Sequence, residues 1–316
     1  MTTNSGFSAT STTDEVLAGI DLQGRRFLVT GASGGLGLET SRSLAARGAI
    51  VVMAARDQAK NETAAAGIRA ALPDAQLESL ILDLGSLKSV RAAAAEFMSR
   101  NVALHGLILN AGIMATPLGH TVDGFEQQFG VDHLGHFLLA RDVLPRLVES
   151  APARVVVLSS AGHRMGDVDF DDVNFERRDY EPFLAYGAAK TCNVLHAVEI
   201  DRRYRDQGVR AFAVHPGVIH TELGRYMTDE TMASLISRLS ESPAAMAWKS
   251  PEQGAATSVW AATSSLLDGR GGEYCEDCNV SAVVADGELN DGGVAARAVD
   301  PARAAALWAL SEKLVG

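Results

Sequence analysis

Tyr186 and Lys190 stand four residues apart at the start of a segment with helical spacing, which places both side chains on one helix face. A phenol with an ordinary pKa near 10 is a weak acid or base at neutral pH, but a neighbouring ammonium favours the phenolate and lowers that pKa. Ser160, at the end of an apolar run, could hydrogen-bond a substrate carbonyl that Tyr186 protonates as hydride arrives. These residues predict acid–base chemistry on a carbonyl or an alcohol. An isolated Tyr-x-x-x-Lys is more often a solvated helix face, so the prediction depends on the other motifs.

A glycine-rich turn follows the apolar run 27–30 and leads into a helical segment. Gly31, Gly35 and Gly37 leave no Cβ in the way, so a pyrophosphate could lie against backbone N–H groups at the start of the helix. The pattern predicts a dinucleotide-binding turn. A flexible turn without a ligand is the simpler alternative.

The same letters also fit a different motif. Residues 31–35 read G-x-S-x-G, the nucleophile elbow of α/β-hydrolases, with Ser33 as the nucleophile. Only one predicted strand precedes this turn, however, and no HGGG-like oxyanion segment occurs upstream. The position therefore favours the dinucleotide turn over the hydrolase.

Strand-length apolar runs alternate with helical segments along most of the chain. This alternation predicts an α/β fold with a doubly wound, mostly parallel sheet of the Rossmann type in a single domain. Residues 21–316 form the predicted domain, and residues 1–20 are a polar tail with a short lead-in helix at 16–20. The strands are predicted at 27–30, 49–55, 77–82, 104–109, 154–160 and 209–214, with a last one within 272–285; long helical regions are predicted at 125–148 and 186–204, and a substrate loop at about 220–250.

Chemistry-bearing residues follow nearly every predicted strand. In a parallel sheet the carboxyl ends of all strands lie on one edge, where ligands bind near the switch in strand order. We therefore expect residues scattered in sequence to converge there: the turn at 31–37, Arg56, Asp83, Asn110, Ser160 and the pair Pro216 and Gly217.

Composition narrows the possible partners. The 316 residues carry a formal net charge of -11, which opposes binding to nucleic acid or to anionic lipid.

Three cysteines indicate a reducing compartment, and Cys275 and Cys278 are expected to be structural thiols rather than a metal site. No stretch has the length of an uninterrupted apolar membrane span, and no apolar leader is visible, so we expect a soluble, cytoplasmic protein without a metal.

Taken together, five motifs resemble the short-chain dehydrogenase/reductase family over about residues 24–274. The motifs are T-G-x-x-x-G-x-G at 30–37, N-A-G at 110–112, the strand-end Ser160, Y-x-x-x-K at 186–190 and P-G at 216–217. Residues 131–139, 186–195 and 215–225 more narrowly resemble the retinol-dehydrogenase and WW-domain-oxidoreductase-like branch. We expect neither the membrane anchor common in that branch nor a WW domain in this chain.

The resemblance implies a catalytic group. Tyr186 is the implied acid and base, Lys190 lowers its pKa and holds the nicotinamide ribose, and Ser160 binds and orients the substrate carbonyl. The family usually has Asn where this chain has Asp132. That Asn holds a helix kink and, through its backbone carbonyl, a water used in proton relay. Asp132 keeps the carbonyl and a similar shape, so we expect activity to survive with an altered pH dependence.

The resemblance also implies a nicotinamide cofactor. Ala55 stands where relatives that prefer NAD carry an acidic residue, and Arg56 follows, so NADP(H) is favoured over NAD(H), with Asp57 as the opposing observation. Asp83 and Leu84 are expected to flank the adenine and Thr221 to reach the carboxamide. The expected cofactor-binding residues are Thr30, Gly31, Ser33, Gly35, Leu36, Gly37, Arg56, Asp83, Leu84, Asn110, Ala111, Gly112, Tyr186, Lys190, Pro216, Gly217, Val218 and Thr221.

The sequence thus predicts an NADP(H)-dependent oxidoreductase that interconverts a carbonyl and an alcohol of a small, fairly apolar substrate. A dinucleotide-binding sensor or scaffold with weak catalysis is the alternative, motivated by Asp132. The resemblance suggests homodimers or homotetramers built on the helices that begin near Phe125 and Tyr186. Neither the substrate nor the reaction direction can be derived from the sequence.

Overall fold

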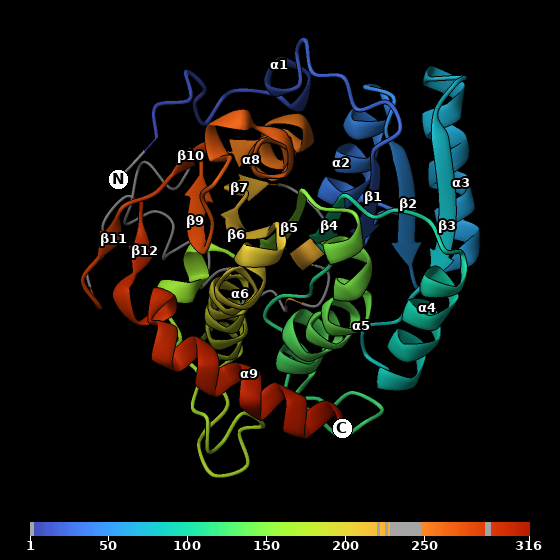
Figure 1. Ribbon diagram of the computed structural model, residues 1–316. Helices are drawn as coiled ribbons and strands as arrows, with labels where there is room; N and C mark the ends of the chain where they lie inside the picture. The colour runs from blue at the N-terminus through green and yellow to red at the C-terminus, as the bar shows by residue number, and fades with distance from the viewer. Residues whose placement is uncertain (1–2, 220–221, 225–226, 228–247, 288–291) are drawn as a thin grey trace.

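One sheet of eight strands forms the centre of the computed structural model, which describes residues 3–219, 222–224, 227, 248–287 and 292–316 (Figure 1). Its strands are β1 (Arg26–Thr30), β2 (Ile50–Ala55), β3 (Gln76–Ile81), β4 (Gly106–Leu109), β5 (Ala153–Leu158), β6 (Val209–His215), β9 (Glu273–Glu276) and β10 (Asn279–Val280). The strand order is β10-β9-β6-β5-β4-β1-β2-β3, and every neighbouring pair is parallel except β9 with β10. The predicted mostly parallel sheet is confirmed.

Helices cover both faces of this sheet (Figure 1). They are α1 (Thr13–Val16), α2 (Gly35–Ala45), α3 (Gln58–Ala71), α4 (Leu87–Ser99), α5 (Gly135–Glu149), α6 (Pro182–Tyr204), α8 (Pro251–Thr263) and α9 (Pro301–Val315). One apolar core contains side chains of α2, α3 and α8, and the other contains those of α4, α5, α6 and α9. Strands such as β5 and β6, buried on both faces, are therefore apolar almost throughout, as parallel strands between two helix layers must be.

Short polar side chains mark where several helices begin. Asp57 accepts a hydrogen bond from the Lys60 N–H at the start of α3, and Ser86 does the same for Ser89 at the start of α4. The short elements between the helices are β7 (Val218–Ile219) paired with β8 (Trp248–Lys249), β11 (Val283–Val284) paired with β12 (Val294–Ala295), and 3-10 turns at Ala161–Arg164, Arg205–Gln207, Glu222–Gly224, Ser265–Leu267 and Ala296–Val299.

The first helix begins earlier than predicted. It spans Thr13–Val16 rather than 16–20, because Thr12 and Glu15 form a reciprocal capping box that fixes its start. The polar residues before it also contact the domain: the Ser5 N–H donates to Asn279 Oδ1 at 2.9 Å.

The region 125–148 is not one regular helix. A π-helix at Phe129–Leu134 precedes α5, so the helical register changes just where Asp132 stands. Such wide turns disrupt the ordinary helical spacing and occur frequently at functional sites. Apolar periodicity alone did not predict this one.

The predicted last strand within 272–285 is a hairpin followed by a separate short strand. Asp277 and Cys278 form its two-residue turn, and both have positive φ angles, of 49° and 57°. Such angles at both central residues characterise tight hairpin turns. The chain therefore reverses after Glu276, and β10 forms the antiparallel edge of the sheet.

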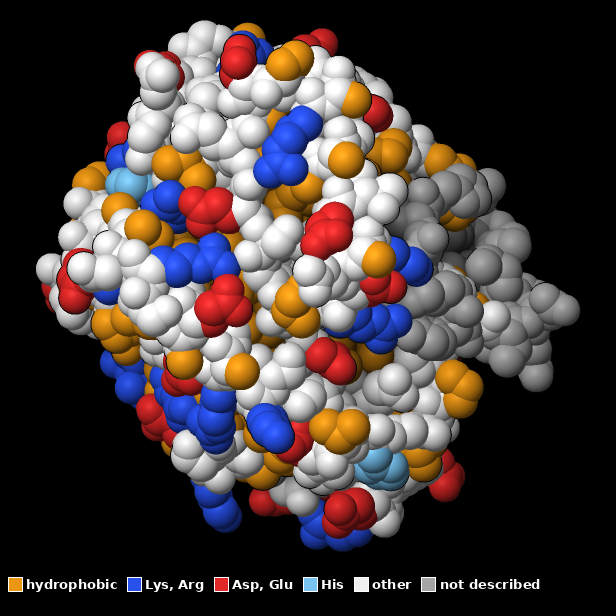
Figure 2. All heavy atoms as spheres, turned by 90° about the vertical axis from the view of Figure 1, so that its right-hand side faces the viewer, with side chains coloured by type: hydrophobic (Ala, Val, Ile, Leu, Met, Phe, Trp, Pro, Cys, Tyr) orange, Lys and Arg blue, Asp and Glu red, His pale blue; other side chains and the backbone are white. Residues whose placement is uncertain are grey.

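Charged side chains of both signs intermingle on the face shown in Figure 2. At the opposite edge of the sheet from β10, Glu78 of β3 accepts from Arg26 at 2.8 Å and from Arg100 at 3.0 Å. Charged side chains along an edge strand disfavour pairing with a strand of another molecule.

Helix α9 lies across α6 (Figure 1). The Trp308 ring packs edge-on against Phe137 of α5, with ring centroids 4.9 Å apart, and Arg203 of α6 stacks on Trp308 at 4.5 Å. Within one copy of the chain, α6 is buried from residue 185 to residue 201. Self-association through the helices near Phe125 and Tyr186 stays a prediction, and these contacts leave little of α6 exposed for it.

Within the described residues, no helix has the length and apolar character needed to cross a membrane.

Replacing Leu307 of α9 by Ala tests this packing. Leu307 is 1% exposed in the core shared by α6 and α9, so Leu307→Ala is expected to lower the free energy of unfolding by about 2–5 kcal/mol. Leu266→Ala, at a leucine that is 50% exposed, is the matched control and should change it by no more than about 0.5 kcal/mol. Urea denaturation measures the free energy of unfolding of both variants. If Leu307→Ala loses no more of it than Leu266→Ala does, α9 does not contribute to the core.

Candidate active site

The glycine turn lies between β1 and α2 and is shaped by close backbone contacts. Gly31 and Gly35 have positive φ angles, of 68° and 52°, a region that favours glycine. A Cβ on Gly37 would collide with the Gly31 carbonyl and with the Asn110 side-chain amide. Only glycine fits at this position, and α2 begins where its N–H groups can bind an anion.

The ends of β1 and β4 are tied together at the point where the strand order changes direction. Thr30 Oγ1 accepts hydrogen bonds from the N–H groups of Asn110, at 2.9 Å, and Ala111, at 3.0 Å, while Asn110 Nδ2 donates to the Thr30 carbonyl at 2.8 Å. The predicted convergence of the glycine turn and the N-A-G segment is therefore present in the structure.

A buried histidine extends this contact toward Asp132. Because Thr30 Oγ1 accepts two N–H bonds, its own hydrogen points at His136 Nε2, 2.8 Å away. His136 Nδ1 then donates to the backbone carbonyl of Asp132 at 3.1 Å. Burial lowers the pKa of His136 to about 3, so the ring is neutral and can both accept and donate.

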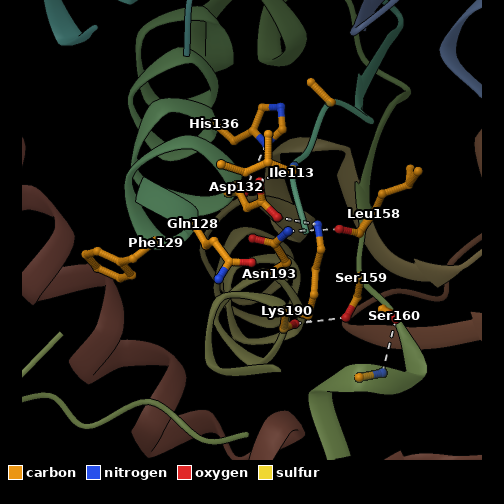
Figure 3. Close-up of polar contacts among 12 residues, drawn as sticks. Ile113, Gln128, Phe129, Asp132, His136, Leu158, Ser159, Ser160, Lys190 and Asn193 are labelled. Atoms are coloured by element: carbon orange, nitrogen blue, oxygen red, sulfur yellow. Dashed lines mark hydrogen bonds and ion pairs between the residues drawn. The ribbon is translucent and has the colours of Figure 1, made fainter. Parts of the chain in front are cut away.

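Asp132 contacts Lys190 directly. Asp132 Oδ2 lies 3.0 Å from Lys190 Nζ, and Oδ1 accepts from the Ile113 N–H at 2.9 Å. Figure 3 shows the two charged side chains pointing toward each other, one from the π-helix and one from α6. A Cβ on Gly112 would lie only 3.3 Å from Lys190 Nζ, so the N-A-G segment passes beside the ion pair.

Tyr186 and Ser160 lie side by side at Gly162. Both surround Gly162, where a Cβ would come within 3.0 Å of the Tyr186 ring and 3.4 Å of Ser160 Oγ. Ser160 Oγ accepts from the Gly162 N–H at 3.1 Å, and Lys190 Nζ lies 5.4 Å from the centre of the Tyr186 ring. The three residues separated by up to thirty positions in sequence thus form one cluster.

The pKa of Tyr186 differs in direction from the expectation. Burial raises it above the ordinary tyrosine value, and this effect outweighs the lowering by Lys190, while Asp132 raises it further. Lys190 lowers the pKa of the phenol as predicted, but the sequence could not show how completely the ring is buried. For Lys190 itself, burial disfavours the charged form, yet Asp132 and Tyr186 outweigh it and raise its pKa.

Two hydrogen bonds fix α6 against the end of β5. Ser159 Oγ donates to the Lys190 carbonyl at 2.8 Å, and Asn193 Nδ2 donates to the Leu158 carbonyl at 2.8 Å (Figure 3). They hold the helix turn that carries Lys190 beside the strand end that carries Ser160.

Two histidines hydrogen-bond the backbone at Ser160 and Ala161 and so hold the chain that follows β5. His163 contacts the Ser160 carbonyl through Nδ1 at 2.6 Å and accepts from the Ala295 N–H through Nε2 at 3.1 Å. His215 Nδ1 accepts from the Ala161 N–H at 3.2 Å. Sequence reasoning missed His136, His163 and His215, although each stands within four residues of a residue that it did identify.

The remaining predicted cofactor residues also lie at strand ends. Arg56 is exposed directly after β2, and Asp83 is exposed two residues after β3, where its Oδ1 accepts from the Gly85 N–H. Leu84 is buried against Gly135. Ser33 lies in the glycine turn and Leu36 in the first turn of α2, and Pro216, Gly217 and Val218 follow β6. Thr221 lies outside the described residues, as does most of the predicted substrate loop.

The C-x-x-C pair lies in the core beside α8. Cys275 and Cys278 are buried and carry free thiols, and burial raises the pKa of Cys278 to about 11. Across the described part of the chain, no group of three or more His, Cys, Asp and Glu side chains is placed to hold a metal ion.

The chain is similar to proteins of one enzyme family along most of its length. The family model described as short chain dehydrogenase matches residues 25–231. Short-chain dehydrogenase/reductase prx1 of Penicillium roqueforti is 43% identical over 299 residues, which cover 93% of this chain and 86% of that protein. Retinol dehydrogenase 12 of Mus musculus is 42% identical, covering 94% and 88%. WW domain-containing oxidoreductase of Gallus gallus is 37% identical, covering 99% and 73%. These relatives confirm the predicted resemblance to that branch.

Solved structures agree. A crystal structure of an uncharacterised protein from Mycobacterium paratuberculosis matches with a TM-score of 0.70 and 37% identity, covering 93% of this chain and 94% of that chain. Gluconate 5-dehydrogenase from Burkholderia cenocepacia, solved with NADP and tartrate, shares the fold with a TM-score of 0.65 and 24% identity, covering 81% and 94%. The alternative role of Ser33 as a hydrolase nucleophile receives no support from these relatives. By its family match and its relatives, the chain belongs to the short-chain dehydrogenase/reductase family.

Proposed function

We propose that this chain is an NADP(H)-dependent oxidoreductase that interconverts a carbonyl and an alcohol on a small, fairly apolar substrate. The observation that carries the proposal is the cluster of Tyr186, Ser160 and Lys190 beside the N-A-G segment, at the carboxyl edge of the sheet. A phenol, a hydroxyl and an ammonium at one strand edge supply a proton, a hydrogen bond to an oxygen and a stabilising charge.

The fold of this family binds a nicotinamide dinucleotide, and the cradle of this chain fits one. The turn admits no Cβ at Gly37, so backbone N–H groups are open to a pyrophosphate at the start of α2. Asp83 and Leu84 would flank the adenine, and Lys190 would reach the nicotinamide ribose. Residues 216–218 and Thr221 would border the nicotinamide. When bound, the dinucleotide gives or takes the hydride.

The side chains of the cluster would donate or accept the proton of the reaction. In carbonyl reduction, Ser160 donates a hydrogen bond to the substrate oxygen, and Tyr186 transfers its phenolic proton to that oxygen as the hydride arrives. In alcohol oxidation the phenolate of Tyr186 accepts the proton instead. The Lys190 ammonium stabilises that phenolate because the two groups are close in a buried site.

Arg56 supports the preference for NADP(H). It is exposed at the end of β2, where the adenosine ribose of a dinucleotide lies in folds of this type. Asp57 was the opposing observation, but its carboxylate caps α3 by accepting from the Lys60 N–H at 3.0 Å. A carboxylate engaged there is less available to accept hydrogen bonds from the ribose hydroxyls, which is how an acidic residue would favour NAD(H).

Two further assignments belong to this proposal. An apolar substrate is supported by relatives named for retinol, an apolar alcohol, and by Met165, an apolar side chain on the segment between Ser160 and Tyr186. A cytoplasmic location is supported by the three cysteines, all of which carry free thiols.

Removing the Tyr186 hydroxyl tests the reaction. Tyr186→Phe should lower NADPH-dependent turnover of a panel of apolar ketones and aldehydes by at least about 100-fold, because the proton donor is lost. NADPH binding should remain. Tyr204→Phe makes the same change on the same helix and should leave turnover unchanged. Turnover of Tyr186→Phe at the wild-type rate would contradict the proposal, and NADPH binding without turnover in the wild type would favour the sensor or scaffold.

Removing the Arg56 guanidinium tests the cofactor preference. Arg56→Ala should weaken NADPH binding by about tenfold or more and leave NADH binding nearly unchanged, because only NADPH carries the 2′-phosphate. Arg69→Ala removes the same charge at the far end of α3 and serves as the control. Titration of each variant with both cofactors measures this difference. Equal affinities for NADPH and NADH in the wild type would overturn the assignment.

A methyl group in the glycine turn tests the position of the cofactor. Gly37→Ala must displace the Gly31 carbonyl or the Asn110 amide, so it should weaken NADPH binding by about tenfold or more, equal to about 1.4 kcal/mol. Gly34→Ala is the matched control and should bind NADPH normally, because a Cβ on Gly34 meets nothing within 4 Å. Calorimetric titration, with thermal unfolding to check the fold, separates the two. Unimpaired binding by a folded Gly37→Ala protein would place the dinucleotide elsewhere.

A further inference from the structure

Asp132 brings a full negative charge into the catalytic cluster. Its carboxylate is completely buried, and Lys190, whose side chain is 4% exposed, lies 3.0 Å from Oδ2. The same ammonium is the cation that stabilises a Tyr186 phenolate. Its positive charge is therefore shared between the Asp132 carboxylate on the π-helix and an anion that forms only when the phenol ionises.

We propose that Asp132 is a positioning residue that offsets the charge of Lys190, so that Tyr186 keeps its proton to a higher pH and the site favours carbonyl reduction near neutral pH. This inference rests on the proposed function of the same cluster. Reduction requires the phenol and oxidation requires the phenolate, so a charge that disfavours the phenolate extends the pH range of reduction upward and delays oxidation.

Few other charges face the pair among the described residues. His136 on α5 is neutral, because burial lowers its pKa to about 3. Tyr274 on β9 is uncharged, because burial raises its pKa well above the ordinary value. Glu126 turns its carboxylate toward the N–H groups at the start of the π-helix, at 2.7 Å from the Phe129 nitrogen, and its pKa is raised by burial. Ser160, which lies beside the Tyr186 ring at Gly162, carries no charge.

Asparagine is a suitable replacement for this aspartate. The Oδ1 of an Asn at 132 can still accept from the Ile113 N–H, so the contact with the N-A-G segment can remain. What disappears is the negative charge on Lys190. The substitution therefore separates the electrostatic role of Asp132 from its structural one.

The first test is a pair of pH–rate profiles for wild type and Asp132→Asn, with the apolar ketone and alcohol pair that the wild type turns over fastest. Asp132→Asn should move the pH at which oxidation begins and reduction declines downward by about one pH unit or more. Asp142→Asn makes the same change on α5, where the carboxylate pairs with Arg141 at 2.9 Å, and should leave both profiles unmoved. Profiles of Asp132→Asn that coincide with those of the wild type, or move upward, would overturn the inference.

A second test needs no turnover. The ultraviolet difference spectrum between a protein and its Tyr186→Phe variant reports ionisation of this phenol in the free protein. Measured in the wild-type and Asp132→Asn backgrounds, the phenolate should appear at lower pH in the latter. Equal titrations would reject the role of Asp132 even if the protein proved to be an active reductase, whereas a downward shift without turnover would reject only the proposed reaction.

Discussion

A buried ammonium requires a counter-ion, and the residues that place a carboxylate beside Lys190 determine much of the geometry of the site. Lys190 lies inside the molecule with Asp132 as its counter-ion, and leaving either charge alone would cost about 3–5 kcal/mol. The π-helix carries Asp132 to that place, and the Ile113 N–H fixes one of its oxygens. Gly112 lets the N-A-G segment pass close to the ammonium, and Ser159 holds the carbonyl of Lys190 itself.

The sheet connects this ion pair to the glycine turn. Because β1 and β4 are neighbours at the switch in strand order, Thr30 can accept from the backbone of Asn110 and donate to His136, which in turn contacts the Asp132 carbonyl. A continuous set of hydrogen bonds therefore runs from the turn expected to bind the dinucleotide to the residue that pairs with Lys190. One buried imidazole, that of His136, thus connects the Thr30 end of this set with the Asp132 end.

Much of this arrangement follows from sequence alone. The alternation of apolar runs and helical segments predicts the sheet, and motifs at strand ends predict which residues meet, since the carboxyl ends of parallel strands share an edge. Tyr186, Lys190 and Ser160 converge as the motifs require.

The missed features depend on packing between distant segments. The pKa of Tyr186 is raised because its ring is buried. That burial exists only once α6 has packed into the folded protein. The resemblance implies a helix kink at residue 132, but apolar spacing has no signature of the π-helix that forms it. The sequence also does not show that the Asp132 carboxylate lies against Lys190. Nothing in the sequence distinguishes His136 from a core histidine of an apolar helix, and only the folded structure places it against Thr30.

A crystal structure of the protein with NADPH tests the central claim most directly. The account predicts that the nicotinamide ring lies beside Tyr186 and Ser160, with the Lys190 ammonium between the ribose and the Asp132 carboxylate and still in contact with Asp132. A nicotinamide bound away from Tyr186, or a Lys190 ammonium separated from Asp132 by solvent, would contradict it.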